Sequence, residues 1–143
     1  MIRSVAKFRA LPAGDRWLLA KALLAVIAVR LRLKLRPFRP GMGESQARTR
    51  SQETGLSPER IAWAVDRAGD RVGNATCLVR ALAAHGLLGR HGFSSCVRIG
   101  VVAGERREKG SDLIAHAWIE MGGRILLGGP DVSRYTPLLT WCN

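Results

Sequence analysis

The chain has 143 residues, a length that fits one compact domain and excludes a multidomain enzyme. Hydrophobic residues make up 47% of it, which is enough for a core and excludes a disordered or collagen-like chain. Lys and Arg number 23 against 11 Asp and Glu, and the formal net charge of +12, taken alone, favours nucleic acid, an anionic membrane surface or an acidic peptide as partner.

The positive charge is concentrated in the N-terminal third. Residues 1–50 contain 12 basic and two acidic residues, whereas the other 93 residues carry a net charge of only +2. No zinc-finger spacing and no aromatic RNA-binding motif accompany these charges, and aromatic residues make up only 6% of the chain. We therefore expect no nucleic-acid partner.

Residues 17–35 form the first predicted helix. The segment is rich in Leu, Ala and Val, but basic residues interrupt it, and its longest uncharged stretch is Ala22 to Val29. A bilayer span needs about 20 mostly apolar residues. We therefore expect an amphipathic helix with a basic end, which packs on the domain, docks a partner protein or contacts a membrane surface from one side.

The residues after this helix predict a linker. Pro37 and Pro40 end the helical pattern, because proline restricts the residue before it. Residues 41–56 are polar, rich in Gly and Ser, and show no periodicity. The sequence thus predicts a basic helical arm with a linker at 1–56 and a globular domain at 57–143.

Two further helices are predicted at the start of this domain. Ser57 is followed by Pro and Glu, the pattern of a helix start, and this helix is expected to run to about Ala68. A second helix is expected to begin near residues 74–76, where Asn74 and Thr76 can both cap it, and to end at Gly86 or Gly89.

Strands follow these helices. From residue 94 to 101 apolar residues alternate with polar or small ones, which is typical of a half-buried strand. Two more strands are expected at 113–121 and 124–127, joined by the Gly-Gly turn at 122–123. Helices followed by an antiparallel sheet favour an α+β fold.

The three cysteines are Cys77, Cys96 and Cys142. They contain no C-x-x-C pair and are preceded by no secretory signal, so they predict neither a disulfide framework nor a zinc site. Cys96 is expected to be a strand residue and Cys142 a terminal thiol, in the reducing environment of the cytoplasm. No metal and no cofactor are expected.

Cys77 has the setting of a nucleophile. It lies in the first turn of the second predicted helix of the domain, where unpaired amide groups and the positive end of the helix dipole stabilise a thiolate. A thiolate is the nucleophile that acyl transfer requires. It needs an imidazole to carry its proton and a polar group to orient that ring.

Among the three histidines, His116 best fits the role of proton carrier. His85 lies about 12 Å along the helix from Cys77, which is too far for direct contact. His91 is expected to be exposed in a turn. His116 lies within an apolar strand, where an unpaired polar group is costly, so we expect it to have a partner. The residues alone leave one alternative open, in which His116 packs in the core and has no catalytic role.

Two carboxylates are candidates for orienting His116. Asp131 follows the third strand, and an antiparallel neighbour can place it beside His116. Asp112 lies four residues before His116, on the same face of an extended strand but about 13 Å along it. We prefer Asp131, for which the alternative is an ordinary turn residue after proline.

Three motifs resemble the transglutaminase-like cysteine proteases that mature lasso peptides. They are Cys77-Leu78-Val79-Arg80 at a helix start, Ile99-Gly100-Val101 in a strand, and Ala115-His116-Ala117-Trp118-Ile119-Glu120 followed by Gly-Gly. The third motif is the most specific, and the resemblance covers roughly residues 57–140.

The resemblance implies a transglutaminase-like, papain-like core and a cytoplasmic peptidase that removes the leader of a lasso peptide precursor before macrocyclisation. It implies Cys77 as nucleophile, His116 as general base and acid, and Asp131 as the orienting carboxylate, with Asp112 as the alternative. The implied partners are the precursor peptide, a separate small leader-recognition protein, which the N-terminal helix is expected to dock, and an ATP-dependent lasso cyclase.

Other interpretations stay open at this point. Trp63 and Trp118 either line the site or pack in the core, and core packing is the more common role of large aromatic residues. A domain of this fold is alternatively a binding or scaffold module without catalysis, or an acyltransferase that passes the thioester to an amine.

Overall fold

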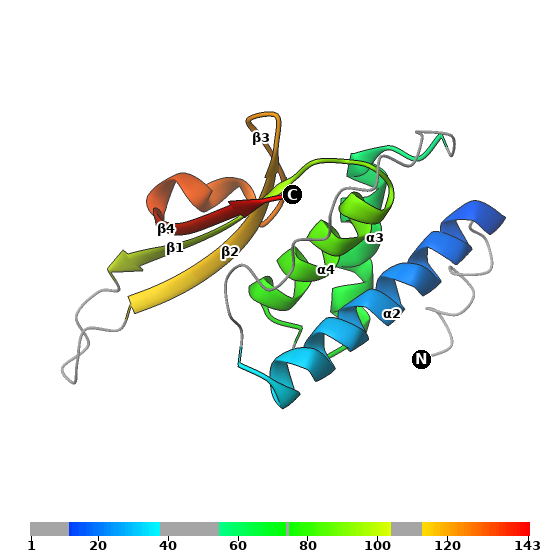
Figure 1. Cartoon of the computed structure of the whole chain (residues 1–143), viewed down its shortest axis with the longest axis horizontal. Helices are drawn as coiled ribbons and strands as arrows, with labels where there is room; N and C mark the ends of the chain where they lie inside the picture. The colour runs from blue at the N-terminus through cyan, green and yellow to red at the C-terminus, as the bar shows by residue number, and fades with distance from the viewer. Residues whose placement is uncertain (1–11, 38–54, 74, 104–112) are drawn as a thin grey trace.

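The chain folds into three layers, with a sheet on one side, α3 and α4 in the middle and α2 on the other side (Figure 1). The computed structural model describes residues 12–37, 55–73, 75–103 and 113–143. The elements are α2 (Ala13–Leu35), α3 (Pro58–Arg71), α4 (Cys77–Arg90), β1 (Cys96–Ala103), β2 (Leu113–Met121), β3 (Arg124–Leu127), the short 3-10 helix η1 (Pro130–Arg134) and β4 (Thr136–Cys142). The predicted α+β fold is confirmed.

Side chains at the predicted positions cap the two helices of the middle layer. The hydroxyl of Ser57 accepts a hydrogen bond from the N–H of Arg60 at the start of α3. The hydroxyl of Thr76 accepts one from the N–H of Val79 at the start of α4. These bonds satisfy amide groups that have no partner within the helix. The helix α3 extends three residues past its predicted end, and Asn74, the other predicted cap, lies outside the described residues.

One face of α2 is part of the hydrophobic core. This helix lies within the predicted arm, yet it packs against α3 and α4 through buried residues. Those residues are Leu18, Leu19, Ala22 and Val26. Packing on the domain is therefore the role of this face. The helix also has exposed apolar residues, Trp17, Leu24, Leu31 and Leu35 being more than half exposed. No helix in the described ranges is long and apolar enough to cross a membrane.

Polar contacts also tie α2 to the middle layer. The guanidinium of Arg30 donates to the carbonyl oxygens of Val72 and Gly73, just after the end of α3, at 3.2 and 2.6 Å. Asp15 in the first turn of α2 forms an ion pair with Arg60 of α3. Part of the basic character of this region therefore serves the packing of the helices.

The sheet is antiparallel with the strand order β3-β2-β1-β4. Val97 of β1 and Ile119 of β2 are paired, fully buried and directed into the helical core. The predicted alternation along β1 holds only in part, because Gly100 is buried whereas Ile99 and Val101 are partly buried. The sequence did not predict η1 and β4. Pro137 disfavours a strand assignment, but β4 lies at the edge of the sheet, where a missing N–H is tolerated.

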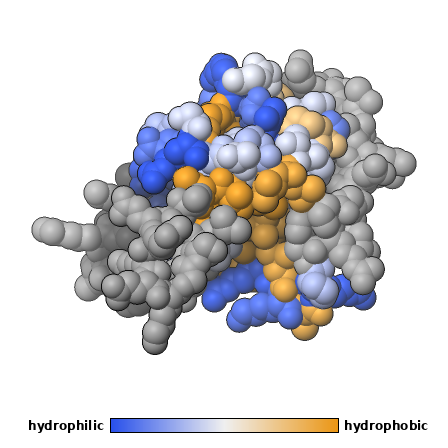
Figure 2. All heavy atoms as spheres, turned by 90° about the vertical axis from the view of Figure 1, so that its left-hand side faces the viewer, coloured by the Kyte–Doolittle hydropathy of each residue, from blue (hydrophilic) through white to orange (hydrophobic). Residues whose placement is uncertain are grey.

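The sheet side of the molecule also carries apolar groups. Figure 2 shows hydrophobic residues that form a band between hydrophilic ones on this side. Large apolar residues exposed on the described strands are Ile114, Ile125 and Leu138. No element with a described position covers these three side chains.

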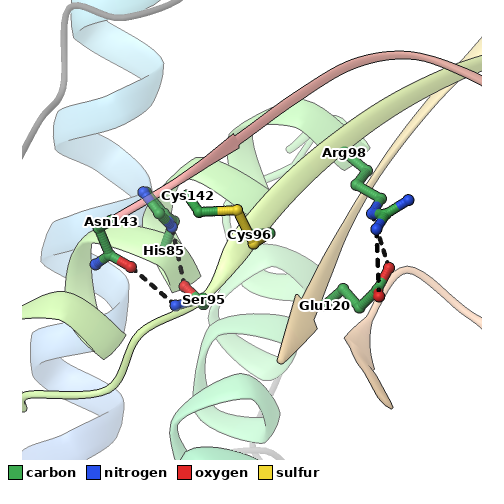
Figure 3. Close-up of a disulfide and its surroundings, with 7 residues drawn as sticks. All are labelled: His85, Ser95, Cys96, Arg98, Glu120, Cys142 and Asn143. Carbon is green, nitrogen blue, oxygen red and sulfur yellow. Dashed lines mark hydrogen bonds and ion pairs between the residues drawn. A yellow bond between two sulfur atoms is a disulfide. The ribbon is translucent and has the colours of Figure 1, made fainter. Parts of the chain in front are cut away.

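Cys96 and Cys142 form a disulfide, so the expectation that no disulfide forms was wrong (Figure 3). The two residues lie directly opposite each other in β1 and β4, with a Cα–Cα distance of 4.1 Å. Such a distance is close enough for a bridge. The pairing depends on β4, which the sequence did not predict, and it leaves Cys77 as the free cysteine.

A buried histidine lies next to this disulfide (Figure 3). His85 on α4 is only 5% exposed, and its Nδ1 lies 2.9 Å from the hydroxyl oxygen of Ser95. The N–H of Ser95 donates to the Asn143 side chain at 2.8 Å. Desolvation by burial lowers the pKa of His85. This histidine therefore joins α4 to the residue that precedes β1.

We predict that oxidised protein has one reactive thiol and that the disulfide stabilises the fold. Thiol titration of unfolded protein is expected to find one thiol before reduction and three after it. In a Cys77→Ser background, reduction is expected to lower the free energy of unfolding by roughly 2–4 kcal/mol, since the bridge closes a long loop of the unfolded chain. Three thiols in unreduced protein contradict this pairing.

We also predict that stability rises as the pH approaches the ordinary pKa of histidine from below, because burial lowers the pKa of His85 and the unfolded chain therefore binds a proton there more readily than the folded chain does. The stabilisation is complete above the ordinary pKa of histidine and is lost as the pH falls below it. Urea unfolding at several pH values measures this slope. His85→Asn, which keeps an amide near the position of Nδ1, is expected to flatten it. An unchanged slope in this variant contradicts the assignment, and His91→Asn is the control for the other histidine whose pKa burial lowers.

Candidate active site

One open cleft of about 480 Å³ contains both Cys77 and His116. It lies where the start of α4 meets α3 and the edge of the sheet formed by β2 and β3. Its lining residues are Asp66, Cys77, Arg80, His116, Ala117, Leu126, Leu127, Gly128 and Gly129. One part of the lining is therefore apolar and another is charged.

Cys77 is the first residue of α4, directly after its cap Thr76. The side chain is half-buried and its thiol is free. The N–H groups of the first helical turn have no partner within the helix, although the one of Val79 bonds to Thr76, and together with the helix dipole they favour negative charge at this position. The helix start therefore presents a thiol in a setting where both a thiolate and an oxyanion are stabilised.

Arg80 lies one turn after Cys77, and its side chain binds the neighbouring helix α3. Its guanidinium donates to the carboxylates of Asp66 and Asp70 on α3 at 2.7 and 2.9 Å, and to the carbonyl oxygen of Ala75 at 3.3 Å. Desolvation alone lowers the pKa of Arg80, but hydrogen bonds and charge from Asp70 and Asp66 outweigh it and raise this pKa above its usual value. Arg80 is therefore charged at any working pH.

Close packing at Gly69 makes room for this arginine. A Cβ atom at Gly69 would lie 2.6 Å from Nε of Arg80. The glycine lets α3 approach α4 while the guanidinium passes between them. The start of α4, and with it Cys77, is thus positioned by an ion-pair network and by small residues.

His116 has the partner that its apolar surroundings require. Its Nε2 lies 2.6 Å from the carbonyl oxygen of Gly128. A carbonyl oxygen only accepts hydrogen bonds, so in the neutral ring Nε2 carries the hydrogen and Nδ1 has a free lone pair. The ring is further flanked by the aromatic rings of Tyr135 and Trp118, with centroids 5.0 and 6.2 Å away.

The structure shows no hydrogen bond or ion pair between Asp131 and His116. Asp131 lies in η1, is exposed and has no hydrogen-bond or ion-pair partner among the described residues. Asp112 lies outside the described residues. Their predicted orienting role stays a prediction.

The two candidate tryptophans do not line the cleft as the structure describes it. Trp118 is 3% exposed and its ring lies over Gly100, where a Cβ atom would approach the ring to 2.9 Å. Trp63 is partly buried against the helical core, with the guanidinium of Arg60 over its ring at 5.5 Å. Core packing is the role that these contacts indicate for both.

Comparison with known protein families matches residues 22–140 to the Transglutaminase-like superfamily. The chain belongs to this superfamily. The match includes most of α2 together with the sheet and the cleft, in agreement with the packing of α2 on the core. Comparisons with curated proteins and with solved structures gave no match. Superfamily membership supports the coarse chemistry of a cysteine peptidase or acyltransferase and leaves the substrate to be proposed.

Sequence reasoning missed two groups at this site. Arg80 belongs to a quoted motif, but its two carboxylate partners lie on another helix, so no spacing rule connects them. The carbonyl group of Gly128 was missed because every residue has a backbone carbonyl, so the residue type does not indicate which carbonyl accepts this hydrogen bond. The Gly-Gly pair before Pro130 was the available signal, since both glycines have positive φ.

We predict that Cys77 reacts with iodoacetamide faster in the folded protein than after unfolding. His116→Ala is expected to slow the reaction at pH 7 by roughly tenfold, because the Cys77 thiol loses the base that takes its proton. The rate is measured on oxidised protein, in which Cys77 is the free cysteine. His91→Ala is the matched control, since it removes a histidine outside the cleft. Equal rates in the two variants contradict a working Cys77–His116 pair.

Proposed function

We propose that this protein is a cysteine peptidase that cleaves the leader from a lasso peptide precursor. The observation that carries the proposal is the cleft that holds a free thiol at a helix start and an imidazole with an available Nδ1. Membership of the Transglutaminase-like superfamily supports thiol chemistry at this position. The AHAWIE motif supports the narrower assignment to lasso peptide maturation.

The proposed reaction is acyl transfer to water in two steps. Nδ1 of His116 takes the proton of the Cys77 thiol, and the thiolate attacks the carbonyl carbon between leader and core. The oxyanion that forms is stabilised by the N–H of Cys77 and its neighbours at the helix start. His116 then gives its proton to the nitrogen of the core peptide as the C–N bond breaks, which leaves the leader as a thioester on Cys77.

Water completes the reaction. His116 takes a proton from the water molecule, whose oxygen attacks the thioester carbonyl carbon. The bond from carbon to sulfur breaks, the thiolate recovers a proton from His116, and the leader leaves with a new carboxyl group. The acyltransferase alternative differs only in this step, because an amine takes the place of water.

The partners belong to the same proposal. The precursor peptide is the substrate, a small separate protein recognises its leader, and an ATP-dependent cyclase takes the released core. Exposed apolar and basic residues of α2 support docking of the recognition protein on that helix. A peripheral contact of α2 with a membrane stays the alternative. The cytoplasm as compartment is supported by the resemblance to the lasso peptide proteases alone, because the Cys96–Cys142 disulfide removes the argument from free cysteines.

We predict that the protein cleaves a lasso precursor peptide at one junction and that Cys77→Ala abolishes this cleavage. The measurement is mass spectrometry of precursor incubated with enzyme, with and without the leader-recognition protein. Cys142→Ala is a control that removes the disulfide and keeps Cys77. A stimulation by the added protein supports its assignment as partner.

Two other outcomes contradict the peptidase. Leader joined to an added amine, with little free leader acid, indicates the acyltransferase. Intact precursor in every mixture, with folded protein and Cys77 no more reactive than an unfolded thiol, indicates the binding module.

A further inference from the structure

The hydrogen-bond acceptor of His116 is a backbone atom and not a side-chain atom. Nε2 of the ring lies 2.6 Å from the carbonyl oxygen of Gly128, in the segment that follows β3. This bond fixes the hydrogen on Nε2 and the plane of the ring. It leaves Nδ1, the atom that must take a proton from a thiol, without a hydrogen.

The position of this carbonyl is set by close packing on Trp118. At Gly128 φ is +124°, a conformation that residues with a Cβ atom rarely adopt. A Cβ atom there would lie 2.3 Å from Cβ and 3.0 Å from Cα of Trp118. Any other residue forces the segment away from β2, and the carbonyl oxygen moves with it.

Trp118 itself has little freedom to yield. Its side chain is buried, and the far edge of its ring rests on Gly100, where a Cβ atom would come within 2.9 Å. The backbone carbonyl oxygen of Thr136 lies equally close to that position. The tryptophan is thus held between two glycines, so the contact that places the Gly128 carbonyl is rigid.

No carboxylate takes this role among the described residues. Asp131 is exposed and unpaired in η1, and Asp66 is engaged with Arg80. Nε2 already has its acceptor, so a carboxylate has to displace the Gly128 carbonyl in order to bond to this nitrogen.

We propose that the main-chain carbonyl of Gly128 orients His116, and that Gly128 is a positioning residue for the Cys77–His116 pair. The proposal rests on the proposed function, because it requires that Cys77 and His116 perform the reaction. A neutral carbonyl sets the tautomer and the ring orientation as a carboxylate does, but it adds no negative charge beside the imidazolium. The site therefore depends on geometry and on the helix start for its reactivity.

The first experiment measures the pH dependence of Cys77 alkylation by iodoacetamide in oxidised protein. Gly128→Ala is expected to slow the reaction at pH 7 by roughly tenfold. It is also expected to shift the midpoint, the pH at which the alkylation rate is half its maximum, because a displaced carbonyl no longer holds the His116 ring in place. Gly123→Ala is the matched control: its φ is also positive, at +76°, but no atom lies within 4 Å of the added Cβ. It is expected to keep the wild-type midpoint. Equal midpoints in all three proteins overturn the proposal.

The second experiment does not require Gly128→Ala to fold. Long-range nitrogen–proton NMR of wild-type protein is expected to show His116 with its hydrogen on Nε2, and Asp131→Asn is expected to keep this tautomer. A hydrogen on Nδ1 overturns the proposal, because Nε2 then donates to no acceptor. A change of tautomer in Asp131→Asn also overturns it and assigns the role to the carboxylate. Failure of the proposed function is distinct, since it appears as uncleaved precursor while His116 keeps the expected tautomer.

Discussion

The burial of α4 is the constraint on which the structure depends. This helix contacts α2, α3, β1 and β2, and its inner positions are mostly small or aliphatic, with Ala81, Ala84 and Leu88 fully buried. Small side chains let these four elements approach one helix closely, and the apolar area removed from water stabilises the arrangement. Because α4 is held on several sides, its first residue, Cys77, is presented to the edge of the sheet in a defined position.

The imidazole side of the cleft depends on a second packing cluster. Trp118 is buried outside the main helical core, beside His116, Tyr135 and two glycines. Close packing allows little adjustment around a large rigid ring, so the backbone near Gly128 has few alternatives. The backbone carbonyl of Gly128 therefore has a defined position relative to His116. The chemistry of the cleft is in this way coupled to the packing of the sheet.

Charge serves structure at several places where composition alone suggested binding. Arg30 interacts with the carbonyl groups that follow α3, Arg60 pairs with Asp15, and Arg80 joins two carboxylates of α3 beside the cleft. Of these three arginines only Arg30 belongs to the basic N-terminal third, and its contacts within the fold account for one of the positive charges there. The exposed apolar residues of α2 are the feature of this region that intramolecular packing does not explain.

Local patterns in the sequence determined the helix starts at Ser57 and Thr76, the first three strands and the placing of Cys77 in a first turn, because caps and periodicities act over a few residues. The need of His116 for a partner also followed from its apolar neighbours. Only the tertiary structure decided which atom that partner is, that β4 joins β1 and pairs Cys96 with Cys142, and that α2 belongs to the core. These contacts join residues far apart in the chain or involve backbone atoms. Neither kind of contact can be inferred from the residue types alone.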